Sequence, residues 1–425
     1  MEIILIFVLL LVLLITGLPV FMSLGSLAVG VLLLTGQNLN SLPSCFYGSM
    51  DHFVLLAVPQ FMLMAQIMTK GGVGDDLFDF VNVWLRHLPG GLAMTTVVTC
   101  AIFAAICGSS TATAVTIGIA AIPAMQRYNY DKPFVLGLVA AGGTLGILIP
   151  PSGPMIIYGA VTDTSVGKLF IAGILPGILI TLLFVLYCYL HSVRLPGVTS
   201  QPPCSWTERW QALRRAALSL VMPPVIVGGI YLGYFTPTEA AGVGATMSFI
   251  ICFLIYRRLG WRDVAPILTD TIKTTAMIFM IIGAANYFGQ VLTINQIPQR
   301  IVQLALDLEL SKWTFLLFVN VLLLFLGCFL EVVSCILIVV PLIFPIVLEL
   351  GIDPVWFAII FTINMELALI TPPVGMNLYV LLGISETNMG EILKGILPFI
   401  LLLITGLVLI MAFPSLSLWL PNFMR

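Results

Sequence analysis

The chain has 425 residues, of which 60% are hydrophobic and 8% are charged, and its formal net charge is −2. Soluble domains carry roughly a quarter charged residues, so this composition excludes a soluble protein. The small net charge and the lack of a basic tract give no support for a nucleic-acid partner. Many apolar runs approach the ~20 residues that span a bilayer, and none alternates as an outer-membrane barrel does. The sequence therefore predicts an all-α polytopic membrane protein.

The first apolar run, Ile3–Ile15, is expected to be a retained membrane helix. Glu2 is acidic where a signal peptide carries basic residues, and no small-residue cleavage site follows the run. The eight cysteines include no Cys-x-x-Cys pair and lie mostly in apolar runs, where cysteine behaves as a small hydrophobe. They predict neither a disulfide framework nor a transition-metal site.

Residues 1–193 are expected to form a first structural repeat. Its hairpin, about residues 92–125, has two apolar arms that meet at the polar tip Gly108–Thr111. A helix over about residues 134–160 then contains Pro150–Pro151. Adjacent prolines remove backbone donors and clash with the preceding turn, so the helix must break there. A broken helix in lipid exposes carbonyls that only protein, water or an ion can satisfy.

A basic linker, residues 194–216, divides the chain and is expected to face the cytoplasm, because cytoplasmic loops carry an excess of Lys and Arg. Residues 217–425 are expected to form the second repeat. Its hairpin, about residues 312–348, precedes a helix over about residues 355–384 that Pro372–Pro373 breaks. The order of elements in the first half thus recurs in the second.

The two proline pairs are 222 residues apart (372 − 150 = 222), and Gly153 and Gly375 keep the same spacing. Matching loops differ in charge, since Arg127–Lys132 is basic whereas Glu349–Asp353 is acidic. The positive-inside rule then places these loops on opposite sides of the membrane. We therefore expect an inverted-topology repeat, and two discontinuous helices at corresponding places indicate a transporter's binding site.

Helix breaks and hairpin tips together predict two cation sites. Carbonyls that have lost their donors lie at the negative end of a half-helix, which suits a hard cation such as Na⁺. Ser109 and Thr111 add hydroxyl oxygens at the first tip, and Glu331 takes the position of Ser109 in the second half. The predicted Na⁺ ligands are Cys107, Ser109, Gly146, Ile149 and Pro151 in the first half and Glu331, Ala368, Thr371 and Pro373 in the second.

The half-helix that begins near Ser152 directs N–H groups and a positive dipole end toward the same centre, which suits a substrate carboxylate. The predicted substrate-binding residues are Ser109, Ser110, Thr111, Thr113, Ser152 and Asn377. Small polar residues also allow helices to pack closely, and we prefer that interpretation for Thr116 and Gly118. Catalysis is not expected, because the three histidines lie near the ends of apolar runs with no serine in a Gly-x-Ser-x-Gly setting.

Three ionisable residues within apolar runs keep more than one interpretation. Glu331 binds a cation, takes a proton or pairs with an arginine, because a carboxylate at this depth is functional by default. Glu366 is either functional or a hydrogen-bonded structural group. Lys273 is a buried counter-charge or extends to an interface. The length of the hairpin arms likewise does not decide between re-entrant and spanning arms.

With these motifs the chain resembles, over essentially its whole length, the large membrane (M, DctM-like) subunit of tripartite ATP-independent periplasmic (TRAP) transporters. The segments that carry the resemblance are residues 108–113, 143–153 and 371–375, which are specific in combination. The resemblance implies an elevator-type fold with scaffold and transport domains in the inner membrane. It implies Na⁺-coupled import of an organic acid that a periplasmic binding protein delivers.

The resemblance also implies a small four-helix membrane partner, the Q subunit, which some members fuse to the N-terminus of the M region. Because this chain starts at the M region, a separate Q chain is expected. The substrates that such systems carry include C4-dicarboxylates and sialic acid, and both stay open. The many hydroxyl groups and the scarcity of fixed positive charge at the predicted site favour sialic acid slightly.

Three alternatives remain. The closest is a stand-alone carrier of dicarboxylates or inorganic anions with the same architecture, which copurification of a small membrane chain would distinguish. A channel would share the apolar spans, but two discontinuous repeats suit alternating access better. An intramembrane aspartyl protease is the most remote, because Gly72–Asp75 and Tyr130–Asp131 lie in polar loops, in the reverse of that family's order.

Overall fold

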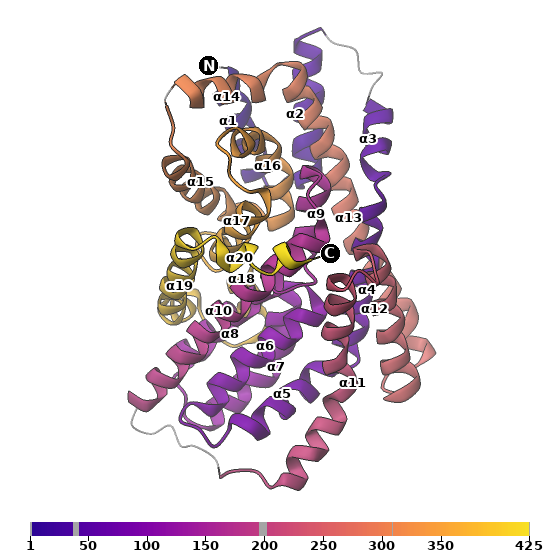
Figure 1. The fold of residues 1–425 in the computed structure, drawn as a ribbon, viewed down its shortest axis with the longest axis vertical. Coiled ribbons are helices and arrows are strands. Elements are labelled where there is room, and N and C mark those ends of the chain that lie inside the picture. Colours follow the sequence, from indigo (N-terminus) through magenta and orange to yellow (C-terminus); the bar gives the residue numbers. More distant parts are fainter. Residues whose placement is uncertain (1, 37–41, 195–201, 308, 425) are drawn as a thin grey trace.

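The computed structural model describes residues 2–36, 42–194, 202–307 and 309–424 (Figure 1). Across these ranges the regular structure is helical, as the composition predicts. The first half contains α1 (Glu2–Ile15), α2 (Val20–Leu34), α3 (Leu42–Met50), η2 (Phe53–Leu56), α4 (Ala57–Lys70), α5 (Val73–Leu85), α6 (Gly91–Cys107), α7 (Ser110–Arg127), α8 (Lys132–Leu148), α9 (Gly153–Thr162) and α10 (Val166–Arg194).

The second half is helical as well. It contains α11 (Trp206–Tyr231), α12 (Pro237–Phe249), η3 (Ile250–Ile255), α13 (Trp261–Ile294), α14 (Ile297–Asp307), α15 (Lys312–Gly327), α16 (Val332–Glu349), α17 (Pro354–Leu369), α18 (Met376–Ile384), α19 (Met389–Ala412), α20 (Ser415–Leu418) and η4 (Pro421–Phe423).

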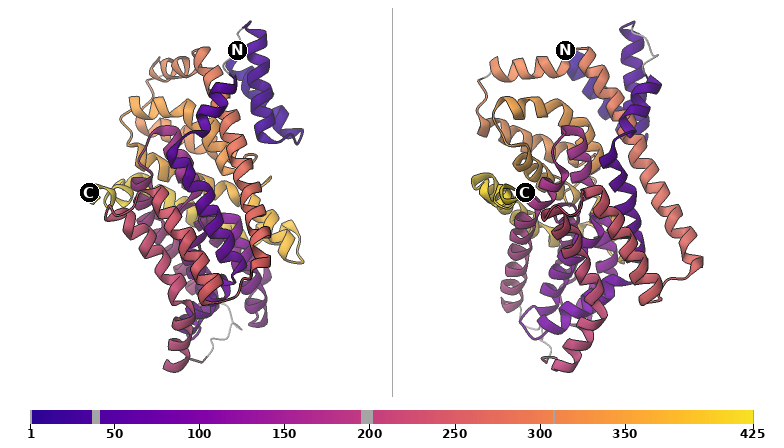
Figure 2. Two further views of the ribbon diagram at one scale, coloured as in Figure 1. Left: turned by 90° about the vertical axis from the view of Figure 1, so that its right-hand side faces the viewer. Right: turned by 45° about the vertical axis from the view of Figure 1, so that its right-hand side comes forward.

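Two groups of helices make up the molecule. In the first, α2, α3 and α4 pack along α13, and α12 packs against α4. α13 has 34 residues and therefore extends about 51 Å, along one side of the molecule in Figure 2. In the second group, α8 lies among α6, α7, α17 and α19. α5 follows α4 of the first group and packs against α6 and α7 of the second, so it connects the two.

The two helices that end just before Pro150–Pro151 and Pro372–Pro373 lie at the centre. α8 is buried at every position from Phe134 to Leu148, and α17 at every position from Val355 to Leu369. A helix that is apolar on all sides is buried on all sides, so the sequence of these segments accounts for their place. Each ends in the middle of the molecule, where its proline pair follows (Figure 1).

Helix α11 begins at Trp206, inside the predicted linker 194–216, whose residues 195–201 lie outside the described part of the chain. The backbone N–H of Glu208 donates to Ser205 Oγ at 3.2 Å, and the N–H of Ser205 donates to the Glu208 carboxylate at 2.8 Å. This reciprocal pair is a capping box, which satisfies donors that a helix start leaves free. The helix therefore starts about ten residues before the apolar run does.

An ion pair holds α5 on the linker side of the molecule. The two terminal nitrogens of Arg258 donate to the two carboxylate oxygens of Asp76 at 2.7 and 2.8 Å. The same guanidinium donates to the carbonyls of Gly71 and Gly72 in the turn between α4 and α5. A bidentate pair fixes orientation as well as distance. Arg258 thus ties the segment after η3 to the start of α5.

Eight helical segments in the described ranges are long and apolar enough to cross a membrane. They are Phe53–Lys70, Lys132–Thr162, Val166–Arg194, Trp206–Tyr231, Pro237–Ile255, Trp261–Ile294, Val332–Glu349 and Met389–Ala412. Large apolar side chains are exposed on α10 and α19, including Leu182, Leu186, Leu397 and Leu401. Apolar exposure on this scale suits lipid rather than water. The chain is a multi-pass membrane protein.

Helices α8 and α19 cross at a pair of glycines. A Cβ added at Gly395 would lie 1.7 Å from the carbonyl oxygen of Pro133, and one added at Gly137 would lie 2.2 Å from the carbonyl oxygen of Gly395. No side chain fits between backbones this close, and membrane helices use small residues for such crossings. The crossing fixes α19 against the helix that leads to the first break.

Replacing Gly395 with Ala is therefore expected to destabilise the protein by about 1–3 kcal/mol, because overpacking forces the backbones apart. The matched control is Gly289→Ala in α13, where an added Cβ meets nothing within 4 Å. Alanine at that helical position is expected to be neutral or slightly stabilising. Thermal unfolding of the purified variants in one detergent measures both. Equal melting temperatures for the two variants would contradict the close crossing.

Candidate functional site

Pro150–Pro151 and Pro372–Pro373 each interrupt a helix as predicted, whereas another adjacent pair, Pro223–Pro224, lies inside the continuous helix α11. α8 ends at Leu148 and α9 begins at Gly153, while α17 ends at Leu369 and α18 begins at Met376. The Pro150–Pro151 and Pro372–Pro373 peptide bonds are both cis. The first break is largely buried, whereas Pro372–Val374 of the second is exposed. The two breaks therefore share a covalent pattern but lie in different surroundings.

The tip of the first hairpin packs directly on the first break. Gly108 has φ +61°, and a Cβ added there would lie 2.4 Å from the carbonyl oxygen of Pro151. A Cβ added at Gly146 would lie 2.6 Å from the carbonyl oxygen of Ser109. Glycine is needed at both positions because backbone meets backbone. The structure thus brings together the predicted residues Ser109, Gly146 and Pro151, with buried Cys107 at the adjoining end of α6.

The carbonyls at the first break lack their usual helical donors. In an α-helix the carbonyl of residue i accepts from the N–H of residue i+4, and residues 150 and 151 are prolines without an N–H. The carbonyls of Gly146 and Ile147 are the ones affected. The Ser152 hydroxyl donates to the carbonyl of Ile147 at 2.6 Å. A predicted substrate residue therefore satisfies one of these carbonyls.

The hydroxyl groups of Ser109, Thr111 and Thr113 interact within the tip's own turn. Ser109 caps α7, with its Oγ 3.5 Å from the N–H of Ala112 and 3.4 Å from Thr111 Oγ1. The Thr113 hydroxyl donates to the carbonyl of Ser109 at 2.8 Å. The predicted ligand Ile149 directs its side chain to Gly177 of α10 instead. The backbone carbonyl is therefore the only oxygen that Ile149 can offer to a cation.

The second hairpin makes equivalent contacts with the second break. The N–H of Val374 donates to the carbonyl of Cys328 at 3.3 Å, and a Cβ added at Gly327 would lie 2.4 Å from that of Ala368. The Thr371 hydroxyl donates to the carbonyl of Leu367 at 2.6 Å. Among the predicted residues, Ala368 thus lies against the end of α15, whereas Pro373 is exposed.

Two intramembrane carboxylates differ in their surroundings. Glu331 stands at the N-cap of α16 without forming a side-chain cap, and its Oε1 is buried without a hydrogen-bond partner. Glu366 is 0% exposed, and neither of its carboxylate oxygens has a hydrogen-bond partner among the described residues. Lys273 is exposed on α13, so it is not a buried counter-charge.

A buried chain of hydrogen bonds also joins the two halves of the molecule. Ser110 Oγ donates to Asn377 Oδ1 at 3.0 Å, and Asn377 Nδ2 donates to the carbonyl of Ala140 in α8 at 3.0 Å. Asn377 is completely buried and lies in the first turn of α18. The two predicted substrate residues Ser110 and Asn377 thus meet, although they are 267 positions apart in sequence.

A polar pair in the second half was not predicted. Asn364 Nδ2 donates to Asn320 Oδ1 at 2.7 Å, which ties α17 to α15. Asn320 was missed because the predicted site followed the breaks and tips, and it lies in the apolar arm before the second tip. A polar residue inside an apolar membrane run is the signal that points to it.

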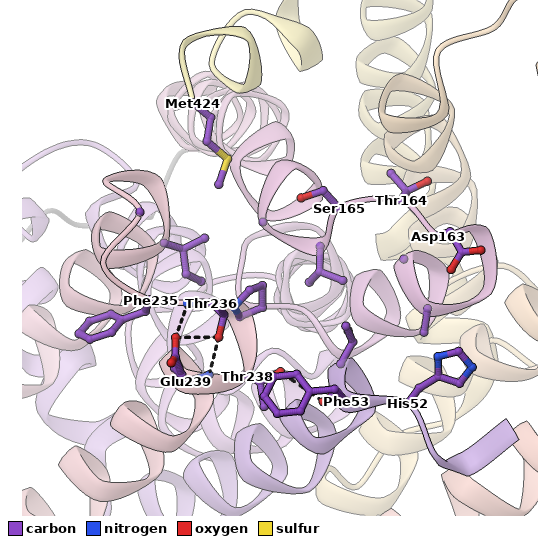
Figure 3. A pocket seen from close by; sticks show the side chains of 18 of the residues that line it. His52, Phe53, Asp163, Thr164, Ser165, Phe235, Thr236, Thr238, Glu239 and Met424 are labelled. Carbon is purple, nitrogen blue, oxygen red and sulfur yellow. Dashed lines mark hydrogen bonds between the residues drawn. The ribbon is translucent and has the colours of Figure 1, made fainter. Parts of the chain in front are cut away.

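A separate pocket of about 640 Å³ (Figure 3) lies at the C-terminal end of α11, where Ile230 lines it. Asp163 and Ser165 from the α9–α10 turn line one wall, and Thr236 and Glu239 from the start of α12 line another. Asp163 has φ +53° and ends α9, which agrees with a loop position rather than a place at a helix break. The pocket contains none of the predicted ligands.

These features define a class of protein before any comparison. Two central helices are interrupted in a membrane protein, and a hairpin tip closes each interruption, which is the architecture of secondary transporters with discontinuous helices. Residues 7–416 match the profile of the family described as "Tripartite ATP-independent periplasmic transporter, DctM component". The chain belongs to this family.

Known relatives agree with this assignment. The chain is 42% identical over 403 residues to the C4-dicarboxylate TRAP transporter large permease protein DctM of Pseudomonas aeruginosa, covering 95% of this chain and 94% of the relative. It is 35% identical over 411 residues to the sialic acid TRAP transporter large permease protein SiaM of Vibrio cholerae, covering 96% of each. The Alcanivorax borkumensis YdaH transporter shares the fold at TM-score 0.57 and 17% identity, over 88% of this chain and 87% of that one.

Replacing Asn377 with Ala is expected to destabilise the protein by about 1–3 kcal/mol, because Ser110 and the carbonyl of Ala140 lose their partner in a buried site. Thr405→Ala is the control, since the Thr405 hydroxyl bonds only to its own helix at Leu401 and is exposed. Melting temperatures of Asn377→Ala, Ser110→Ala and the double variant form a double-mutant cycle. Strictly additive losses would contradict the bond between the halves.

Proposed function

We propose that the chain is the large membrane subunit of a Na⁺-coupled secondary transporter that imports an organic acid by an elevator mechanism. The observation that carries the proposal is the packing of each hairpin tip against a proline-broken helix at the centre of the molecule. Half-helices that meet in the membrane offer carbonyl ends for a cation and N-terminal ends for an anion. Family membership supports the same function.

Helix bounds support the inverted repeat that this function requires. The second hairpin arm spans Ser110–Arg127 in the first half and Val332–Glu349 in the second, and 332 − 110 and 349 − 127 both equal 222. α8 and α17 start 222 residues apart as well. The linker and the basic ends of the first hairpin face the cytoplasm in this orientation, and Glu349–Asp353 faces the periplasm. The arms are then re-entrant, because their tips meet breaks that lie midway along a span.

Backbone oxygens are the main Na⁺ ligands in this proposal. At the first break the carbonyl of Gly146 has lost its donor to proline, and the Cα of Gly146 packs against the backbone of Ser109 at the tip. At the second break the carbonyl of Leu369 has lost its donor to Pro373 in the same way. Glu331 adds a carboxylate near the second tip, where the first has a hydroxyl. Hard cations prefer such oxygen ligands, so we expect two related but unequal sites.

The substrate carboxylate is proposed to bind between the breaks, at the N-terminal ends of α9 and α18. Helix N-termini offer N–H donors and a positive dipole end to anions. Ser152 and Asn377 lie at these two ends, and Ser110 joins Asn377. Relatives are named for C4-dicarboxylates and for sialic acid. The higher identity to a C4-dicarboxylate permease makes succinate-like acids the first class to test and sialic acid the second.

The packing groups support an elevator. The helices around α13 would form the scaffold, and those around α8 and α17 would move with the two breaks, while α5 connects both groups. The family description is tripartite, so a periplasmic binding protein and a small Q subunit are the proposed partners in the bacterial inner membrane. A stand-alone carrier would need neither.

Uptake into proteoliposomes tests the whole proposal. Uptake of the acid is expected only with an inward Na⁺ gradient, with the small subunit and with the cognate binding protein. Transport by this chain alone would favour the stand-alone carrier, as would purification without a small membrane partner. Uptake that is indifferent to the Na⁺ gradient would contradict the sodium coupling.

Two variants address the individual breaks. Ser109→Ala removes a hydroxyl at the first tip, and Pro373→Ala restores a backbone N–H at the second break. Each is expected to raise the half-saturating Na⁺ concentration about tenfold, the equivalent of one lost ligand of about 1.4 kcal/mol. Thr405→Ala in α19 serves as the control and should keep the wild-type value. Unchanged Na⁺ dependence in both break variants would refute these sites.

A further inference from the structure

A second large hollow lies beside the first break. Its volume is about 650 Å³, within the range of ligand pockets. α6, α10 and α11 form its walls, and Ile149 and Pro150 of the break form its inner end. The remaining lining residues are Val98, Ala101, Ile102, Ala105, Ile174, Ile178, Thr181, Leu182, Leu220, Pro223, Pro224, Val227 and Gly228.

The side chains of this groove favour an apolar occupant. Thr181 is the one lining residue with a polar side chain, and its hydroxyl already donates to the carbonyl of Gly177 at 2.7 Å. Water in an apolar cavity needs two or more polar partners, which the side chains here do not supply. An empty groove would leave its lining without dispersion contacts. The occupant is therefore apolar.

The position of the groove identifies the source of that occupant. Ile178 and Leu182 both line the groove and are exposed on α10, to 50% and 58%. The groove is thus continuous with the apolar outer face of two predicted spans, α10 and α11. Along α11 it runs from Leu220 to Gly228, eight residues or about 12 Å at the helical rise. A flexible hydrocarbon chain fits this length and is what surrounds these spans.

We propose that the groove between α6, α10 and α11 binds one acyl chain of a membrane phospholipid, which packs against Ile149 and Pro150 and supports the apolar side of the first break. The hairpin tip meets the backbone of this break from another side, through Gly108 and Gly146. The acyl chain therefore completes the packing around this break segment, which belongs to no helix. This proposal depends on neither sodium coupling nor the substrate, so it stands or falls separately from the proposed function.

Gly228 offers a variant that fills the groove without disturbing the fold. A Cβ added there meets nothing within 4 Å, so the side chain of Gly228→Phe has open space to enter. Ala105→Leu fills the groove from the opposite wall and serves as the second variant. Gly30→Phe is the matched control, because Gly30 is also a helical glycine whose added Cβ meets nothing within 4 Å.

The test uses the full chain in nanodiscs that contain a phosphatidylcholine with a diazirine in its acyl chain. After irradiation, adducts are mapped by mass spectrometry and scaled to those on the exposed α19 face at Leu397 and Leu401. We expect enriched adducts on the groove residues of α6 and α11, and about tenfold fewer in Gly228→Phe or Ala105→Leu, since a filled site loses its binding free energy. Gly30→Phe should label as the wild type does.

Two results would overturn the proposal. Groove labelling no higher than that of α19 would show that no acyl chain is held there. Labelling that is unchanged in both filled variants would place the bound chain elsewhere. If a copurifying protein covers the groove instead, the adducts disappear from α6 and α11 and the lipid assignment is wrong.

Discussion

Inside a membrane, a backbone carbonyl that has lost its donor must find another in the protein, in water or in an ion. Pro150–Pro151 and Pro372–Pro373 create that problem at the ends of the buried helices α8 and α17, whereas α11 continues through Pro223–Pro224. The structure meets it by bringing a hairpin tip against each break, so close that glycine is required at positions 108 and 146. Positions of the tips, arms and half-helices all follow from this one requirement.

The two solutions are not equivalent. The first break is enclosed, with the Ser152 hydroxyl on the carbonyl of Ile147, whereas the second exposes Pro372–Val374. The second half has two carboxylates, Glu331 and Glu366, where the first half has Ser109 and Thr144 at the same spacing. Glu366 has no hydrogen-bond partner among the described residues. A buried charge without a partner is costly, so the proposed cation or a proton would have most to stabilise in this half. The inequality suits a cycle in which the two breaks have different tasks.

Much of this arrangement could be predicted from the sequence, because its signals are local. Proline pairs mark the breaks, and apolar periodicity and small-residue tips mark the hairpins, whose observed ends fall within one or two residues of the predicted ones. Contacts between distant residues could not be predicted. The bond from Ser110 to Asn377 and the crossing at Gly395 depend on how helices pack, which one sequence does not reveal.

Other differences have physical causes as well. Helix α11 starts at Trp206 because a capping box at Ser205 outweighs the polar character of the segment, and that motif was present in the sequence. Lys273 had two interpretations because an isolated cation in an apolar helix does not reveal its direction. Its exposure on α13 is seen only in the structure, because it depends on how that helix packs.

Hydrogen exchange of the purified chain in Na⁺ or in K⁺ tests the central claim most directly, because it needs no partner and no substrate. If Na⁺ completes the contacts between tips and breaks, it should slow exchange at residues 107–113 and 370–377 relative to K⁺ at equal ionic strength. The remote turn at Gly71–Gly72 should exchange equally in both salts. Identical exchange at both breaks in the two salts would contradict the account.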